Sequence, residues 1–272
     1  MSLSLGKLKL DGKCHVMGIL NVTPDSFYDG GWHFDSDKAK SRVEQMIAEG
    51  AEIIDIGGES TRPGSKPVGV DEELERVIPI IKFITNISDI PISIDTQKAE
   101  VARKAVEAGA CVVNDVGGLR NPDMIQAVAE MKIPVTIMHM QGTPENMQKN
   151  PSYDNTVTDI KNWLEERIKV AEMAGIKRSD IIVDPGIGFG KNLKHNLEIL
   201  GGLEEFKNMS GGVLLGASRK SFIGFLTGAE DSDRLTGSLA AAIMGATAKV
   251  DLVRVHDVKE TRMAINATNA LS

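Results

Sequence analysis

Residues 92–115 read ISIDTQKAEVARKAVEAGACVVND, and this stretch decides the fold. Two apolar runs, Ile92–Ile94 and Val112–Val113, each stop at a polar residue. Between them, residues 98–108 repeat apolar side chains at helical spacing and stop at a glycine. Short, uninterrupted apolar runs are typical of strands in a parallel sheet that is covered on both faces. The stretch therefore predicts a strand, a helix and a second, parallel strand.

The same unit recurs along the whole chain. Apolar runs that end at polar or glycine-rich clusters lie at His15–Leu20, Ile53–Ile56, Ile92–Ile94, Val112–Val113, Val135–Met138, Ile181–Val183, Val213–Leu215 and Leu252–Val253. Segments with helical character follow them, at residues 37–49, 72–84, 98–108, 124–131, 157–174, 195–207, 234–249 and 258–269. Eight such units predict an α/β fold, the (β/α)8 TIM barrel, which typically needs about 250 residues. We expect residues 1–272 to form one domain, with residues 1–13 as an N-terminal lead-in.

Composition and charge limit the binding partners and the cellular compartment that we expect. The 272 residues carry a net charge of −7, which argues against nucleic acid or an anionic membrane as a partner. Cys14 and Cys111 sit in or beside apolar runs and are expected to be buried, reduced thiols. The start of the chain has no apolar signal segment, and no stretch reaches the roughly 18 apolar residues of a membrane span. These features predict a cytoplasmic protein.

A closed barrel gathers the carboxyl ends of its strands at one rim, so the polar clusters would meet there. Long non-periodic segments also begin at strand ends, at residues 21–35, 57–70 and 139–155. Long loops on a barrel rim are usually functional, and we expect the first two to act as lids. Asp55 is an acid inside an apolar run, and it is expected to be a hydrogen-bonded residue that points inward near the rim.

Eight motifs occur in the order of these strands. They are GILNVTPDSF at 18–27, GGESTRPG at 57–64, SIDT at 93–96, VNDV at 113–116, MHMQGTP at 138–144, DPGIGFGK at 184–191, SRKSF at 218–222 and RVHD at 254–257. In this order the chain resembles the dihydropteroate synthase family over residues 17–257. The resemblance implies an enzyme that joins 6-hydroxymethyl-7,8-dihydropterin diphosphate to p-aminobenzoate and releases pyrophosphate. It also implies Mg²⁺ as cofactor and a homodimer.

A dihydropterin edge presents adjacent N–H donors beside a carbonyl, which suits a carboxylate and an amide. The resemblance implies that Asp184 and Asn114 hold this edge, while Asp95 adds a ring contact. Each residue also has a local alternative. Asp95 with Thr96 could cap the next helix, Asn114 with Asp115 could make an Asx turn, and Asp184 could open a turn. The substrate-binding residues that the resemblance adds are Met138, Phe189 and Gly216.

The motif after the seventh run places a basic pair where barrels often bind anions. The resemblance implies that Lys220 contacts the pterin ring and that Ser221 receives the p-aminobenzoate carboxylate. Arg219 would support the same pocket. The alternative is that the Arg219–Lys220 pair is an ordinary solvated surface pair.

Arg254 and His256 close the last run two residues apart, a spacing that predicts the same face. A guanidinium can stack on the pterin and reach phosphate oxygens, and His256 can donate to the leaving diphosphate. Asn21, at the end of the first run, is the expected contact to Mg²⁺ or the diphosphate, because Mg²⁺ needs few protein ligands beside phosphate oxygens.

The lid loops supply the remaining site residues. The resemblance implies that Phe27 and Pro63 line the p-aminobenzoate pocket. It also implies that Thr61 and Arg62 contact the leaving group. Asp29 would face Mg²⁺. One departure from the family lies beside it, because Tyr28 stands where a small residue is common, so this loop is expected to pack differently around residue 28.

Catalysis would then rest on electrostatic stabilisation of the departing pyrophosphate. The residues expected to act catalytically are Arg62, Lys220, Arg254 and His256. Two other functions stay open, a methyltetrahydrofolate-binding methyltransferase and a non-catalytic pterin-binding barrel, because one barrel fold hosts many activities. The methyltransferase would not need the TPDSF loop or the SRKS motif. The string GIGFGK is not a nucleotide-binding P-loop, because Pro185 and Asn192 stand where that loop requires glycine and a hydroxyl residue.

Overall fold

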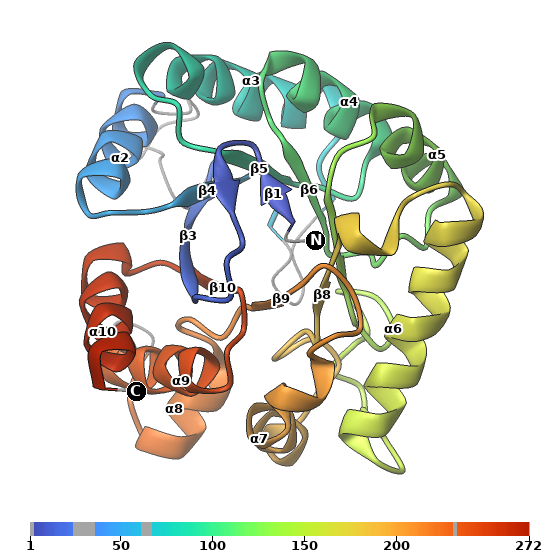
Figure 1. The fold of residues 1–272 in the computed structure, drawn as a ribbon, viewed down its shortest axis with the longest axis vertical. Coiled ribbons are helices and arrows are strands. Elements are labelled where there is room, and N and C mark those ends of the chain that lie inside the picture. Colours follow the sequence, from blue (N-terminus) through green and yellow to red (C-terminus); the bar gives the residue numbers. More distant parts are fainter. Residues whose placement is uncertain (1–2, 24–35, 61–66, 231–232, 272) are drawn as a thin grey trace.

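The computed structural model describes residues 3–23, 36–60, 67–230 and 233–271, and it is built around a closed barrel of parallel strands (Figure 1). The barrel strands are β3 His15–Asn21, β4 Ile53–Gly57, β5 Ile92–Asp95, β6 Val112–Asp115, β7 Val135–Met138, β8 Ile181–Asp184, β9 Gly212–Leu215 and β10 Leu252–Val255. Neighbours along the chain pair in parallel, and β10 pairs with both β9 and β3 to close the ring. The TIM barrel expected from the sequence is confirmed.

Helices surround the strands in Figure 1. They are α2 Ser36–Ala48, α3 Val70–Ile87, α4 Ala99–Ala108, α5 Pro122–Met131, α6 Thr156–Met173, α7 Leu193–Gly201, α8 Ser221–Thr227, α9 Leu235–Thr247 and α10 Val258–Leu271, with 3-10 turns η1 Arg178–Asp180 and η2 Leu203–Phe206. Glycine ends α4 as the sequence predicts, with Gly109 at φ 124°. No helix in the described residues is long and apolar enough to cross a membrane.

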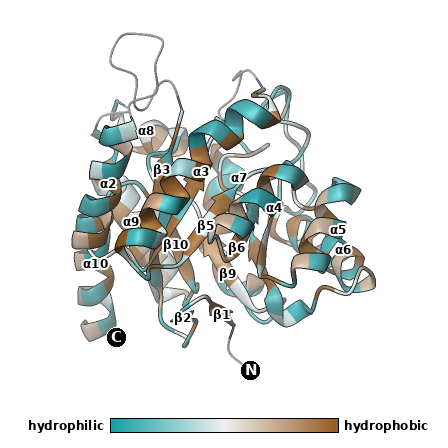
Figure 2. Ribbon diagram, turned by 90° about the horizontal axis from the view of Figure 1, so that it is seen from above, coloured by the Kyte–Doolittle hydropathy of each residue, from teal (hydrophilic) through white to brown (hydrophobic). Residues whose placement is uncertain are grey.

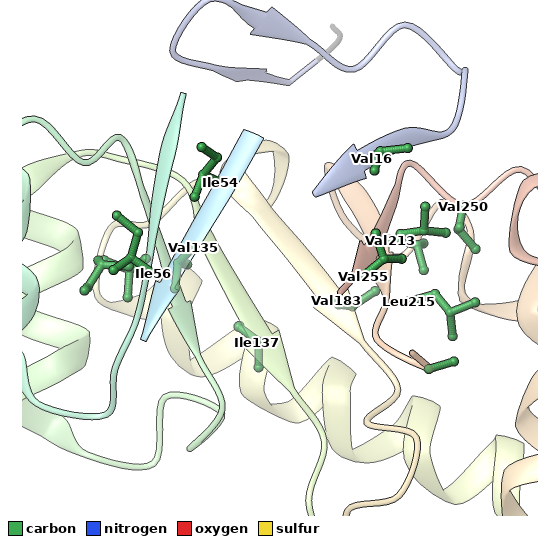
Figure 3. Packing of buried hydrophobic residues seen from close by; sticks show 14 of the residues in the cluster. Val16, Ile54, Ile56, Val135, Ile137, Val183, Val213, Leu215, Val250 and Val255 are labelled. Carbon is green, nitrogen blue, oxygen red and sulfur yellow. The ribbon is translucent and has the colours of Figure 1, made fainter. Parts of the chain in front are cut away.

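Alternate strand residues have opposite environments, as the pleat requires. One set is apolar and packs into the layer between barrel and helices, for example Ile54, Ile56, Ile137 and Leu215 (Figure 3). The other set lines the interior of the barrel. It is apolar at the strand starts and polar at the strand ends, where Asp95 is the last residue of its strand. The fold therefore places apolar packing at one end of the interior and charge at the other.

The N-terminal lead-in is a structured element that the sequence did not predict. Residues Ser4–Leu5 (β1) and Leu8–Lys9 (β2) form an antiparallel hairpin. Leu3, Leu5 and Leu10 are buried with residues from the strand starts, so the hairpin closes the floor of the barrel. In Figure 2 the hairpin lies beneath the strands, beside the N-terminus.

One expected helix is too long. The helix expected over residues 195–207 ends at Gly201, and the separate turn η2 follows. A Cβ at Gly202 would lie 2.9 Å from a methyl carbon of Val157, so the chain approaches α6 closely where the helix stops.

Candidate active site

The polar rim of the barrel is organised around a buried guanidinium. Arg254 donates through Nε to Asp55 Oδ2 at 2.5 Å and through Nη2 to Asp95 Oδ2 at 2.6 Å. Asn114 Nδ2 donates to the same Asp55 oxygen at 3.1 Å. These residues come from β4, β5, β6 and β10, so the side chains cross the barrel interior to meet. Asp55 is the inward, hydrogen-bonded residue that the sequence predicts.

Asp184 and Lys220 meet beside Gly216. A Cβ built on Gly216 would lie 3.7 Å from Asp184 Oδ2 and 3.8 Å from Lys220 Nζ. Lys220 Nζ also donates to the Ile187 carbonyl and stands 4.6 Å from the centroid of the Phe189 ring. The missing side chain at residue 216 thus leaves room next to one carboxylate, one ammonium and one aromatic face.

Burial and charge act together on these groups. Burial raises the pKa of Asp184 and the pKa of Asp95, and in both cases a nearby cation works against that rise. Burial lowers the pKa of Lys220 to about 8, although Asp184 and Asp95 favour its charged form. Burial also opposes the charge of Arg254, yet Asp55 and Asp95 raise the pKa of this arginine above its usual value. Each cation is thus influenced by the same acids, which places them in one electrostatic centre.

A second group of residues lies at the outer edge of the rim. His256 Nδ1 is 3.1 Å from Ser218 Oγ, and Arg219 makes an ion pair with Asp257. His256 lines a cavity of about 510 Å³ together with Asn21 and Arg219. Residues expected to contact the diphosphate, the metal and p-aminobenzoate therefore share one cavity.

The structure distinguishes, for each of Asp95, Asn114 and Asp184, between a local capping or turn role and a position in the rim. Thr96 Oγ1, not Asp95, accepts the Lys98 N–H at the start of α4. Asp115, not Asn114, accepts from two backbone N–H groups in the following turn. Asp184 does open its turn, because Oδ1 accepts from Gly186 N at 2.7 Å. Its Oδ2 faces Gly216, so one carboxylate both shapes the loop and enters the rim.

The rest of the expected site is partly described. Met138 is buried in a small cluster against which Phe189 packs, and Ser221 is the exposed first residue of α8. The lid residues expected in the site lie outside the described residues, namely Phe27, Asp29, Thr61, Arg62 and Pro63. Within the described part of the chain, no group of three His, Cys, Asp or Glu residues is placed to hold a metal ion.

Comparison with known proteins agrees with this geometry. The family model described as "Pterin binding enzyme" matches residues 17–256. The dihydropteroate synthase of Escherichia coli K12 is 48% identical over 94% of this chain and 91% of its own length. The chain belongs to the dihydropteroate synthase family. It is an enzyme of the transferase class.

Solved dihydropteroate synthases share the fold throughout. The Yersinia pestis enzyme, in a complex with a sulfonamide drug, superposes with a TM-score of 0.94 at 44% identity and covers 100% of this chain and 99% of its own. The Xanthomonas albilineans enzyme, solved with 4-aminobenzoic acid, has a TM-score of 0.91 at 46% identity over 97% of this chain and 94% of its own.

Sequence reasoning missed two residues that the structure ties to the rim. Ser218 holds His256, and Arg42 of α2 donates to the His256 carbonyl at 2.8 Å. Arg42 carried no signal, because it lies far from His256 in the sequence.

Proposed function

We propose that this rim joins 6-hydroxymethyl-7,8-dihydropterin diphosphate to p-aminobenzoate and releases pyrophosphate. The observation that carries the proposal is the meeting of Asp184, Lys220 and the Arg254 cluster in one buried centre. A flat heterocycle with both donor and acceptor edges needs a carboxylate, an amide and a cation around it. Separate strands supply these groups here.

Asp184 Oδ2 is the partner for two adjacent N–H groups of the pterin, because an ionised carboxylate accepts two parallel bonds. Asn114 serves the mixed edge through its amide, and Asp95 lies next to it in the register of β5 and β6. Lys220 contacts the ring from the loop after β9. Two carboxylates bind the Arg254 guanidinium through its N–H groups and fix its orientation, which leaves its planar face for stacking on the ring.

The leaving group faces the cavity lined by Asn21 and His256. The bond between the pterin CH₂ and the diphosphate oxygen breaks, and the electron-rich ring stabilises positive charge on that carbon. His256, Arg254 and Arg62 stabilise the departing anion. The uncharged aniline nitrogen of p-aminobenzoate then forms a bond to the carbon and releases a proton to water. Because the two substrates react with each other directly, no covalent enzyme intermediate is needed.

Magnesium fits the donors at this cavity. Asn21 offers a neutral amide oxygen at the cavity wall, and Mg²⁺ is commonly held by one or two protein oxygens together with substrate phosphates and water. Asp29 is the second expected ligand. When bound, Mg²⁺ would neutralise charge on the diphosphate.

p-Aminobenzoate binds on the outer side of the rim. Arg219 and Ser221 would receive its carboxylate, and Phe189, Phe27 and Pro63 would contact its ring. The ion pair between Arg219 and Asp257 holds that guanidinium at the cavity edge, which supports this placement.

The assembly is a homodimer that works in the cytoplasm. Large exposed apolar side chains concentrate on three adjacent helices, namely Phe225 and Leu226 of α8, Ile243 and Met244 of α9, and Met263 and Leu271 of α10. Exposed large apolar side chains on neighbouring helices are typical of a protein interface. Free Cys14 and Cys111 are consistent with a reducing compartment.

The test is pyrophosphate release from dihydropterin diphosphate with Mg²⁺, measured with and without p-aminobenzoate. We expect release that depends on p-aminobenzoate and yields dihydropteroate. Arg254→Ala and His256→Ala should chiefly lower kcat, while Arg178→Ala, which removes a surface cation, should not. Pterin binding without such release would indicate the non-catalytic barrel, and methyl transfer from methyltetrahydrofolate would indicate the methyltransferase.

A further inference from the structure

His256 is held on three sides. Its backbone N–H donates to Ser218 Oγ at 3.2 Å, and its carbonyl accepts from Arg42 Nη2 at 2.8 Å. Its ring nitrogen Nδ1 lies 3.1 Å from the same Ser218 Oγ. The residue directly follows β10, and these hydrogen bonds to Ser218 and Arg42 fix its backbone and its ring where the strand ends. Such fixing costs conformational entropy and is expected where one ring orientation matters.

The protons in this cluster can be counted. A serine hydroxyl has one proton to donate and can accept two bonds. Ser218 Oγ already accepts the backbone N–H of His256, and Ser218 is only 7% exposed. If Nδ1 carried a proton, Oγ would accept twice and the buried hydroxyl proton would have no acceptor in the described hydrogen bonds. A buried donor without an acceptor has lost its hydrogen bonds to water and is destabilising. The geometry therefore favours Ser218 as donor and Nδ1 as acceptor.

We propose that Ser218 is a positioning residue that keeps neutral His256 in the tautomer with its proton on Nε2. A diphosphate oxygen offers only lone pairs, so the ring must present an N–H to bind it. The other tautomer would present a lone pair from Nε2 and repel the departing anion. This inference rests on the proposed function for the role of His256, but the tautomer itself does not.

The tautomer is measured directly by long-range ¹H–¹⁵N correlation NMR on protein labelled with ¹⁵N-histidine. The His256 signals are assigned by their loss in His256→Gln. We expect one neutral tautomer with Nε2 protonated, and a mixture of both in Ser218→Ala. Ser238→Ala is the matched control, because Ser238 is a buried hydroxyl that binds the neighbouring Arg219 N–H and has no hydrogen bond to His256 among those described. Protonated Nδ1 in the wild-type chain, or an unchanged tautomer in Ser218→Ala, would overturn the proposal.

A kinetic cycle tests whether Ser218 acts through His256. Ser218→Ala should lower kcat by about tenfold, less than the hundredfold or greater loss typical of removing an oxyanion donor outright. In a His256→Ala background the same change should cost nothing further, because the group that it orients is absent. Ser218→Thr retains the hydroxyl and should restore both kcat and the single tautomer. Equal losses in both backgrounds would mean a merely structural role. An unchanged kcat in His256→Ala would instead contradict the proposed function and leave the NMR result standing.

Discussion

Charged side chains at the rim are buried, so protein groups rather than water must stabilise their charge. Asp184 is 4% exposed, and its charge is balanced by Lys220 and by the Gly186 N–H. Asp184→Ala should remove a charge-assisted contact to the pterin of roughly 3 kcal/mol, or about a hundredfold in affinity. Calorimetry with a pterin ligand measures this loss. Asp89→Ala, at an exposed acid paired with Lys7, is the control, and near-normal pterin binding by the Asp184 variant would refute its assignment.

Lys220 gives the rim a pH limit. Burial is the main cause that lowers the pKa of Lys220 to about 8, so the ammonium loses its proton as the pH rises through 8. If the charged form binds the pterin, kcat/KM for the pterin substrate should fall above about pH 8, since this ratio reports ionisations of the free enzyme. Lys220→Arg keeps the charge at every accessible pH and should remove the alkaline limb, whatever its effect on the maximum. An alkaline limb unchanged in Lys220→Arg would assign it to another group.

Some roles of single residues could not be predicted from the sequence. The strand ends indicated which polar residues reach the rim, because parallel strands share one end. They could not distinguish Asp95 from Thr96 or Asn114 from Asp115 as the turn-forming residue, since Asp, Asn and Thr all stabilise caps and turns. Hydrogen bonds between residues far apart in the chain, such as Arg254 to Asp55, leave no trace in a single sequence.

At the level of elements, periodicity located every barrel strand, but the hairpin at residues 4–9 was expected only as a lead-in. Leucine alternates with polar residues at 3–5 and 8–10, but each run is too short to predict a strand by itself, and the hairpin is stabilised by contact with the barrel floor. The end of α7 at Gly201 likewise depends on the approach of Gly202 to α6. Tertiary contacts decided these elements, whereas local pattern decided the rest.

The hairpin should therefore stabilise the fold without serving the reaction. Leu5 is fully buried among residues from the strand starts, so Leu5→Ala should cost about 2–5 kcal/mol in the free energy of unfolding, measured by urea denaturation. Leu8 lies on the same hairpin and is only partly buried, so Leu8→Ala should cost less. The folded Leu5 variant should keep its kcat, because the floor and the rim lie at opposite ends of the barrel. A large loss of kcat in the folded variant would mean that the two ends are coupled.

For the whole molecule, the proposed homodimer rests on the exposed apolar side chains of α8, α9 and α10. Some small residues of α9 are used within the shell, since a Cβ at Gly237 would lie 2.3 Å from an Ile223 methyl carbon and one at Gly245 would lie 2.8 Å from Leu215. These inward contacts of α9 glycines leave unexplained the exposed apolar side chains on the solvent side of the neighbouring helices. There, Phe225 of α8 is 76% exposed and Met263 of α10 is 65% exposed. A second copy covering this face would bury the apolar area at about 25 cal/mol per Å².

Sedimentation velocity at micromolar concentration should accordingly show a dimer for the wild-type chain and a monomer for Phe225→Asp, because a buried unpaired carboxylate opposes association. Met173→Asp places the same charge on α6, at a methionine that is 80% exposed, and should leave the dimer intact. The rim network of Asp55, Asp95 and Arg254 comes from one chain, so the Phe225→Asp monomer should still bind a pterin. A wild-type monomer would show that this face serves some other contact, and dissociation by both variants would show that charge rather than position matters.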